Sequence, residues 1–304
     1  MGSVKKLETQ PNRFRRIVGI DFSGAAQSGK TAWAAELVPV GSPFAEFETS
    51  GTSQKAPPFE LVSLASLGRL AGSDERISVN QYLVDRIRSE SETFWGCDFP
   101  FGLPIELLLG AWRSQLSHIK AFAGDAKKFG LSLVEKTKET QGKLHVRRDT
   151  DRETQTPFDC YHYRIIYQTF HGMRDVLAQI ATRQDLAVLP FQYAKFFSGV
   201  SSVIVEACPA STLKRNGLPH QRYKQSGGKA PSREHLSTRR EIMRWVGERV
   251  AISDYRKRVI RQDSGGDALD AVLAAIGAWE AFVREDHRSI ATHKRYPKEG
   301  FVYA

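Results

Sequence analysis

Apolar residues gather in short runs that end at turn residues, a pattern typical of strands in a buried sheet. Five such runs stand out, in the order "RIVGIDFS" (16–23), "KTAWAAELVPV" (30–40), "FELVSLASL" (59–67), "TFWGCDF" (93–99) and "SSVIVEACP" (201–209). The second run fits either a strand or a short helix, whereas the fourth and fifth end where proline cannot continue a ladder. Two shorter runs, "DLAVLPF" (185–191) and "EGFVYA" (299–304), are candidates for minor strands.

Helical spacing dominates much of the remaining chain. The residues "SVNQYLVDRIRSE" (78–90) repeat apolar positions at helical intervals, and the middle of the chain, about 105–195, is mostly helical in pattern. The segment "SGGDALDAVLAAIGAWEAFV" (264–283) is apolar almost all round and therefore predicts a buried helix. This order of elements favours an α/β fold with a mixed sheet. Residues 1–14 are interpreted as a flexible basic tail, and 15–304 as a single domain with a helical insertion.

Composition narrows the class of protein only modestly. The chain has 304 residues, of which 41% are hydrophobic and 26% charged, as is usual for a globular protein. No run reaches the roughly 18 apolar residues that span a bilayer, and the N-terminus has no secretory signal. The three cysteines, Cys97, Cys160 and Cys208, are far apart in sequence, which indicates neither a disulfide framework nor a zinc site. A cytoplasmic protein without a membrane partner is expected.

Positive charge is concentrated in one part of the chain. The net charge is +10, and the segment 214–261 holds fourteen Lys or Arg residues against four Asp or Glu, a surplus equal to that of the whole chain. A solvated helix face would explain such a cluster. A surplus this local also attracts polyanions, so nucleic acid is the partner expected from charge.

One short motif matches the phosphate-binding P-loop pattern, with Gly24, Gly29, Lys30 and Thr31 at the required spacing. A P-loop works only when its Lys and Thr open a helix whose N-terminus holds the phosphates. Here the candidate helix would be barely two turns long before Pro39 stops it. As a strand, the same residues would pair back on the first run. A P-loop nucleoside triphosphatase is therefore the least favoured interpretation.

Acidic residues interrupt several of the apolar elements. Asp21 and Asp98 each end an apolar strand, and if those strands are parallel neighbours their ends lie about 4.8 Å apart. Asp267 and Asp270 are three residues apart, hence on one face of the first turn of the buried helix. Asp267 also suits an ordinary helix N-terminus, whereas Asp270 is followed directly by apolar residues. Glu206 repeats the pattern of an acid inside a buried strand.

Converging carboxylates repel one another, and a divalent cation resolves the repulsion. Oxygen-only ligands favour Mg²⁺ or Mn²⁺, which can activate water for phosphodiester cleavage. We therefore expect the acids Asp21, Asp98, Asp267, Asp270 and Glu206 to be catalytic, the four aspartates among them also serving as metal ligands. Candidates for binding substrate phosphate are Arg147, Arg148, Arg164 and Lys224, although ion pairs on an exposed loop, or plain surface positions, would explain the same residues.

Several motifs together resemble a known family. The stretches "VGIDFSGA", "CDFPFGLP", "VEACPASTLKR" and "DALDAVLAA" occur in the order found in the domain-of-unknown-function 429 family, whose members are predicted nucleases of the ribonuclease-H-like superfamily. The similarity covers about 16–304. The resemblance implies a five-stranded sheet in the order 3-2-1-4-5, with the first three strands antiparallel and the first and fourth parallel neighbours. It also makes "DFSGAAQSGKTAW" a hairpin.

The resemblance further implies roles for individual residues. Resolvase-like members of the superfamily carry acids on the first and fourth strands and a D-x-x-D pair at the start of the last helix, which correspond here to Asp21, Asp98, Asp267 and Asp270. Glu206 is a possible extra ligand. Two other functions stay open on the same fold, namely an actin-like or sugar-kinase-like phosphotransferase and a nucleic-acid-binding protein without catalysis.

Overall fold

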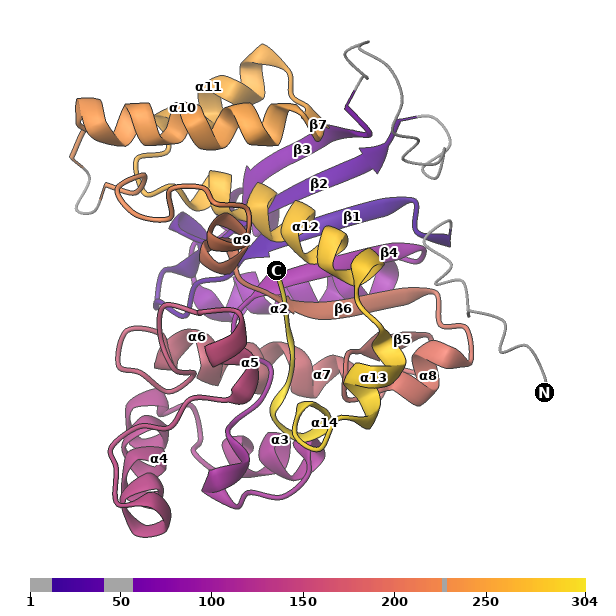
Figure 1. Ribbon diagram of the computed structural model, residues 1–304, viewed down its shortest axis with the longest axis vertical. Helices are drawn as coiled ribbons and strands as arrows, with labels where there is room; N and C mark the ends of the chain where they lie inside the picture. The colour runs from indigo at the N-terminus through magenta and orange to yellow at the C-terminus, as the bar shows by residue number, and fades with distance from the viewer. Residues whose placement is uncertain (1–12, 41–56, 226–228) are drawn as a thin grey trace.

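The structure is a computed structural model of the chain and describes residues 13–40, 57–225 and 229–304 (Figure 1). These residues form an α/β fold around one mixed sheet of eight strands. The strand order is β5-β6-β4-β1-β2-β3-β7, and the short strand β8 pairs with β6. The predicted α/β class and mixed sheet are therefore confirmed.

The five long runs of the sequence form the centre of the sheet. Strands β1 (Arg16–Asp21), β2 (Trp33–Pro39) and β3 (Phe59–Ser66) make an antiparallel meander. Strand β4 (Thr93–Asp98) runs parallel to β1, and β6 (Ser202–Ala207) runs parallel to β4. The ambiguous second run is thus a strand, which pairs back on the first.

Three minor strands extend this centre. The short runs near residues 186 and 302 form β5 (Leu186–Val188) and β8 (Val302–Tyr303), both beside β6. Strand β7 (Val250–Ala251) pairs with β3 and was not predicted. A strand of two residues is too short to give a periodic pattern in the sequence, so only the tertiary structure reveals it.

Helices surround the sheet and fill most of the connection between β4 and β6, as the pattern predicted. The α-helices are α1 (Leu67–Ala71), α2 (Arg76–Ser89), α3 (Trp112–Lys120), α4 (Ala126–Gln141), α5 (Asp149–Glu153), α6 (Ile166–His171), α7 (Ala178–Ile180), α8 (Tyr193–Phe197), α9 (Pro209–Arg215), α10 (Arg233–Gly247), α11 (Asp254–Gln262), α12 (Asp267–Arg284), α13 (His287–Thr292) and α14 (Tyr296–Glu299). A π-helical stretch, Gly172–Leu177, joins α6 to α7. No helix of the described ranges is long and apolar enough to cross a membrane.

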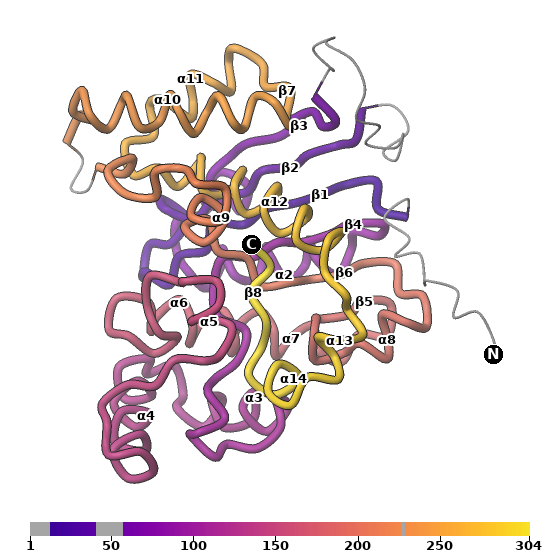
Figure 2. The backbone as a smooth tube through the Cα atoms, viewed as in Figure 1, coloured from indigo at the N-terminus to yellow at the C-terminus, as the bar shows by residue number. Residues whose placement is uncertain are grey.

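Helix α12 lies directly on one face of the sheet, across β1, β2 and β4 (Figures 1 and 2). Two strand glycines permit this close approach. A Cβ atom added to Gly19 would lie 2.0 Å from the carbonyl oxygen of Ala271, and one added to Gly96 would lie 2.6 Å from that of Ala274. A second apolar cluster, which includes α2 and the helices between β4 and β6, covers the other face. The first turn of α12 is thereby fixed near the ends of β1 and β4.

The predicted tail ends earlier than expected. Residues 1–12 lie outside the described part of the chain, but Phe14, assigned to the tail, is buried in the core. Its ring packs edge-on against Trp279 at 6.0 Å and against Phe282 at 5.9 Å. The prediction was wrong at this boundary because a single aromatic residue among arginines gives no periodic signal.

The P-loop interpretation is also wrong. Residues Ser28–Lys30 form one 3₁₀ turn, and β2 begins at Trp33 in place of a helix. The Lys30 ammonium donates to Gln27 Oε1 at 2.7 Å, and the Thr31 hydroxyl donates to Ser23 Oγ at 2.8 Å. The segment is a hairpin connection whose polar groups bond to one another, and it lacks the helix N-terminus that a nucleotide phosphate requires.

Candidate metal centre

Three aspartates from three elements meet where β1 and β4 end. The parallel register of the two strands places Asp21 directly beside Asp98. Asp270, in the first turn of α12, completes the group. One carboxylate oxygen from each of the three residues lies within 4.8 Å of the other two. Asp21 and Asp270 are buried and Asp98 is half-buried. The predicted convergence of these three acids is therefore present.

The start of α12 brings in the fourth aspartate. Gly266 at the N-cap has a φ of 84°, a left-handed conformation that favours glycine, and the Asp263 carboxylate accepts from the amide of Ala268 at 2.7 Å. This start directs Asp267 into the same cleft as the other acids. Asp267 is half-buried and lies outside the close group of three.

The acids carry more negative charge than their surroundings neutralise. Burial and, to a smaller extent, the neighbouring Asp270 raise the pKa of Asp98 to about 8, while Lys224 opposes the shift. Burial likewise holds the pKa of Asp21 well above its ordinary value. The pKa of Asp267 is raised to about 6, mainly by burial. Such mutual destabilisation of charged carboxylates is what a bound cation relieves.

Two adjacent residues between α9 and α10 contact Asp270. The buried Tyr223 donates its hydroxyl to Asp270 Oδ1 at 2.8 Å, and the Lys224 ammonium pairs with Asp270 Oδ2. Partial burial acts to lower the pKa of Lys224, but Asp270 and Asp21 raise it well above its ordinary value, so the ammonium stays charged. Lys224, predicted to bind phosphate, thus lies at the acids themselves. Nothing in the sequence indicated that either residue contacts Asp270.

A buried arginine fixes this pair of residues. Arg239 of α10 donates from Nε to the carbonyl of Tyr223 at 2.5 Å, and from its other nitrogens to the carbonyls of Asp263 at 2.7 Å and Ser264 at 2.6 Å. It therefore ties the connection that carries Lys224 to the residues that precede α12. Sequence reasoning missed Arg239, because nothing distinguishes it from the solvent-exposed arginines of the same helix.

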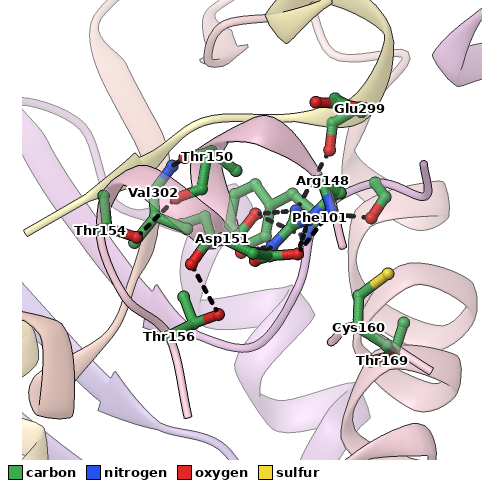
Figure 3. A network of polar contacts seen from close by, with 12 residues as sticks. Phe101, Arg148, Thr150, Asp151, Thr154, Thr156, Cys160, Thr169, Glu299 and Val302 are labelled. Carbon is green, nitrogen blue, oxygen red and sulfur yellow. Dashed lines mark hydrogen bonds and ion pairs between the residues drawn. The ribbon is translucent and has the colours of Figure 1, made fainter. Parts of the chain in front are cut away.

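Glu206 belongs to a separate network around Arg148, and Figure 3 shows Arg148 with its neighbours Asp151, Phe101 and Glu299. Its carboxylate accepts from Arg148 Nη2 at 2.6 Å and Nη1 at 2.8 Å, and from the Phe101 amide at 2.9 Å. Arg148 also pairs with Asp151 at 2.7 Å and donates to the carbonyl of Glu299 at 3.1 Å. The two residues line the cleft, but Glu206 is already paired, and each nitrogen of Arg148 has an acceptor within the protein.

The other two predicted phosphate ligands lie elsewhere. The Arg147 guanidinium donates to the carbonyls of Thr156 and Pro157 at 3.0 and 3.1 Å. Arg164 is exposed, with its guanidinium 5.6 Å from the ring of Phe158. Neither side chain is among the described residues that line the cleft. Of the four basic candidates, the structure brings Lys224 alone into contact with one of the aspartates that meet at the ends of β1 and β4.

The cleft has a volume of about 540 Å³, which lies within the range of small-molecule and substrate sites. Its wall combines the acids with neutral polar groups that the sequence did not single out. These include Ser23, Gln168 and Gln221. Apolar side chains such as Phe22, Phe99 and Phe158 complete the wall. The arrangement suits a ligand that carries both polar and apolar parts.

A basic surface lies on α10 and α11, which run side by side next to β7 (Figures 1 and 2). It is defined here by five exposed arginines that make no ion pair with any described residue: Arg233, Arg240, Arg244, Arg258 and Arg261. Part of the charge surplus seen in the sequence is therefore exposed and makes no ion pair within the described residues.

Comparisons of the chain with protein-family models, with curated proteins and with solved structures gave no match.

Proposed function

We propose that this protein is a divalent-metal-dependent hydrolase of nucleic-acid phosphodiester bonds. The observation that carries the proposal is the meeting of Asp21, Asp98 and Asp270 at one point, with ligand oxygens within 4.8 Å of one another. These acids are far apart in the sequence, and two of them are buried, which disfavours their charged form unless a positive charge lies nearby.

The donor set fits a hard divalent cation. Asp21, Asp98 and Asp270 offer only carboxylate oxygens, which favours Mg²⁺ or Mn²⁺ over zinc, and Asp267 stands at the same cleft as a further ligand. A bound ion of this kind supplies an activated water and stabilises the leaving oxygen. The protein's part is to hold the ligands on two strands and a helix, elements that fix their geometry.

The strand order supports the ribonuclease-H-like assignment. The central run β3-β2-β1-β4-β6 has the 3-2-1-4-5 arrangement that the family resemblance implies, with the first three strands antiparallel. The acids occupy the end of β1, the end of β4 and the start of α12, the positions that resolvase-like members of the superfamily use. The strands β5, β7 and β8 are additions to that arrangement.

The substrate class rests on charge. The basic surface on α10 and α11 presents five unpaired arginines, and these attract the phosphate backbone through sequence-independent electrostatics. An actin-like phosphotransferase would need a second acid-bearing half, whereas the described residues form a single sheet. Nucleic acid is therefore favoured over a nucleotide as the ligand.

A cleavage assay tests the proposal. Labelled single-stranded, duplex and hybrid substrates are incubated with the protein and Mn²⁺, and we expect cleavage that chelation abolishes. Asp21→Asn should lower the rate by at least about 100-fold, on the scale of losing one preorganised electrostatic group. Asp85→Asn removes a 60% exposed acid from α2 and serves as the matched control with unchanged activity.

Other outcomes separate the alternatives. Metal-independent binding without cleavage would identify a nucleic-acid-binding protein. ATP turnover without cleavage would favour a phosphotransferase. Cleavage that survives Asp21→Asn would come from another site or a contaminant and would contradict the proposal.

A further inference from the structure

We propose that Lys224 is a built-in counter-cation, which occupies Asp270 in the metal-free protein and leaves it when a divalent cation binds. This inference rests on the proposed function and adds a form of regulation to the same site. It assigns Lys224 two positions: against Asp270 without metal, and free in the cleft to pair with substrate phosphate once metal is bound.

The contacts of Asp270 are the first support. The Tyr223 hydroxyl donates to one carboxylate oxygen of Asp270 at 2.8 Å, and the Lys224 ammonium pairs with the other. Asp270 is also one of the three residues whose oxygens lie within 4.8 Å of one another. A cation held by all three acids therefore needs an oxygen of Asp270, and both oxygens of that carboxylate already have a partner, one of them the Lys224 ammonium. The ammonium and the metal ion compete for the same ligand.

The charge balance is the second support. Lys224 lines the same cleft as the four aspartates, and its ammonium pairs with Asp270. One ammonium cannot neutralise four carboxylates. A divalent cation brings two charges into the same space, and the site then no longer requires the lysine for charge balance.

The backbone around Lys224 is fixed, so its side chain can change partners while the residue stays at the cleft. Arg239 fixes the carbonyl of Tyr223, and the Gln225 amide donates to the carbonyl of Ser264 at 2.9 Å, so the backbone on both sides of Lys224 is held. Its side chain is 42% exposed and lines the cleft. A flexible four-carbon side chain on a fixed backbone swings between two partners while its Cα atom stays in place.

The two positions of Lys224 predict opposite effects of removing its charge. Metal affinity should rise, because the competitor is gone and the negative potential at the acids is stronger. Affinity for nucleic acid in the presence of metal should fall, because a phosphate partner is gone. An ordinary phosphate-binding lysine would change only the second quantity, and a purely structural lysine would not strengthen metal binding.

Metal titration without nucleic acid is the direct test. Mn²⁺ binding is followed by electron paramagnetic resonance for the wild type, Lys224→Met and Lys257→Met. We expect Lys224→Met to bind Mn²⁺ about tenfold more tightly or better, the scale of removing one charge a few ångströms away. Lys257 is the matched control, because it is 43% exposed and pairs with Asp254 at 3.4 Å. Its variant should bind like the wild type.

A second measurement needs no variant. The wild-type protein is labelled with an amine-reactive reagent, and labelling of individual lysines is quantified by mass spectrometry with and without Mn²⁺. We expect Mn²⁺ to increase the labelling of Lys224, since the ammonium leaves its ion pair, while Lys257 stays unchanged. This measurement keeps the inference testable even if Lys224→Met does not fold.

The outcomes distinguish this inference from the proposed function. If the wild type binds Mn²⁺, Asp21→Asn abolishes the binding and Lys224→Met binds equally or more weakly, the metal centre stands and the competition is refuted. Lys224 labelling that does not respond to bound Mn²⁺ has the same meaning. If neither the wild type nor Lys224→Met binds Mn²⁺, both the proposed function and this inference fall.

Discussion

Two groups of buried charge lie in the walls of one cleft, and they differ in how completely they are neutralised. Around Glu206, Arg148 pairs with two carboxylates, and the Phe101 amide donates a further hydrogen bond. Around Asp270, four aspartates face the single ammonium of Lys224. The first group is complete within the protein. The second group has more carboxylates than positive charges.

This difference distinguishes a structural ion network from a ligand site. Burial lowers and the paired carboxylates raise the pKa of Arg148, with a net shift well above its ordinary value, so the guanidinium is permanently charged and permanently paired. Burial instead raises the pKa of Asp98 to about 8, which means that the site resists holding all its charges. Proximity of acids at a sheet edge is therefore less informative than the balance of charge around them.

The largest effect is expected from breaking the ion network of Arg148, Glu206 and Asp151. Arg148→Met leaves Glu206 and Asp151 buried without their cation, and we expect the free energy of unfolding to fall by about 3–5 kcal/mol in urea denaturation. Arg147→Met, which removes hydrogen bonds to two carbonyls, should cost at most about 1–2 kcal/mol. Equal losses for the two variants would show that the Arg148 network does not stabilise the fold.

Neutralising one acid in each group should then give opposite results. Asp98→Asn removes a carboxylate that the other aspartates repel, so we expect the metal-free variant to be at least as stable as the wild type. Its affinity for Mn²⁺ should fall on the order of a hundredfold, about 2.7 kcal/mol. Glu206→Gln should instead lose about 2 kcal/mol of stability and keep its Mn²⁺ affinity. Calorimetric titration and denaturation of both variants check this; a Glu206→Gln variant that loses metal would place Glu206 in the metal centre.

The pH dependence of stability sharpens the comparison further. A carboxyl group whose pKa is higher in the folded than in the unfolded state binds more protons when the protein is folded. Its contribution to stability is complete below the pKa of the unfolded state and is lost as pH rises through the pKa of the folded state. We expect the metal-free protein to lose stability between about pH 4 and 8, through about pH 6 for Asp267 and about pH 8 for Asp98.

Thermal unfolding across that range measures the loss. Saturating Mn²⁺ should make the loss of stability with rising pH smaller, because the bound ion takes the place of the protons on the carboxyl groups. Asp98→Asn should make stability less dependent on pH near pH 8. A metal-free protein whose stability rises from pH 6 to 8 would show that the pKa values of Asp98 and Asp267 are not raised in the folded state.

The smallest effect is expected at the basic surface. Replacing both Arg240 and Arg244 with Gln should weaken nucleic-acid binding a few-fold and reduce the salt dependence of log K by about 1–2, as expected for two lost phosphate contacts. Lys127 and Lys128 on α4, both exposed, are the control pair. Mn²⁺ affinity should be unchanged in both double variants. An unaltered salt slope would direct the search for the nucleic-acid surface elsewhere.

The sequence predicted the elements that carry the aspartates, because each gives a strong local signal. An apolar run ending in an acid marked Asp21 and Asp98, and an almost wholly apolar helix marked Asp270. The pairing of Arg148 with Glu206 was not predictable in the same way. These residues are 58 positions apart, and a basic residue on a polar loop has no local feature that distinguishes burial from exposure.

Contacts that depend on tertiary structure account for the remaining differences. Arg239 and Lys224 resemble their basic neighbours in sequence, yet one is buried against backbone carbonyls and the other pairs with a buried acid. Strand β7 is too short for any periodicity. The P-loop match is an example of a local pattern that misleads. The residues after it form strand β2, whereas a P-loop requires a helix at that position.

The central claim is that the aspartates of β1, β4 and α12 hold a divalent cation, and anomalous diffraction from crystals soaked in Mn²⁺ tests it most directly. We predict an anomalous peak within coordination distance of Asp21, Asp98 and Asp270, with the Lys224 ammonium moved away from Asp270. Crystals at saturating Mn²⁺ that show no peak there, with Lys224 still paired to Asp270, would contradict the account.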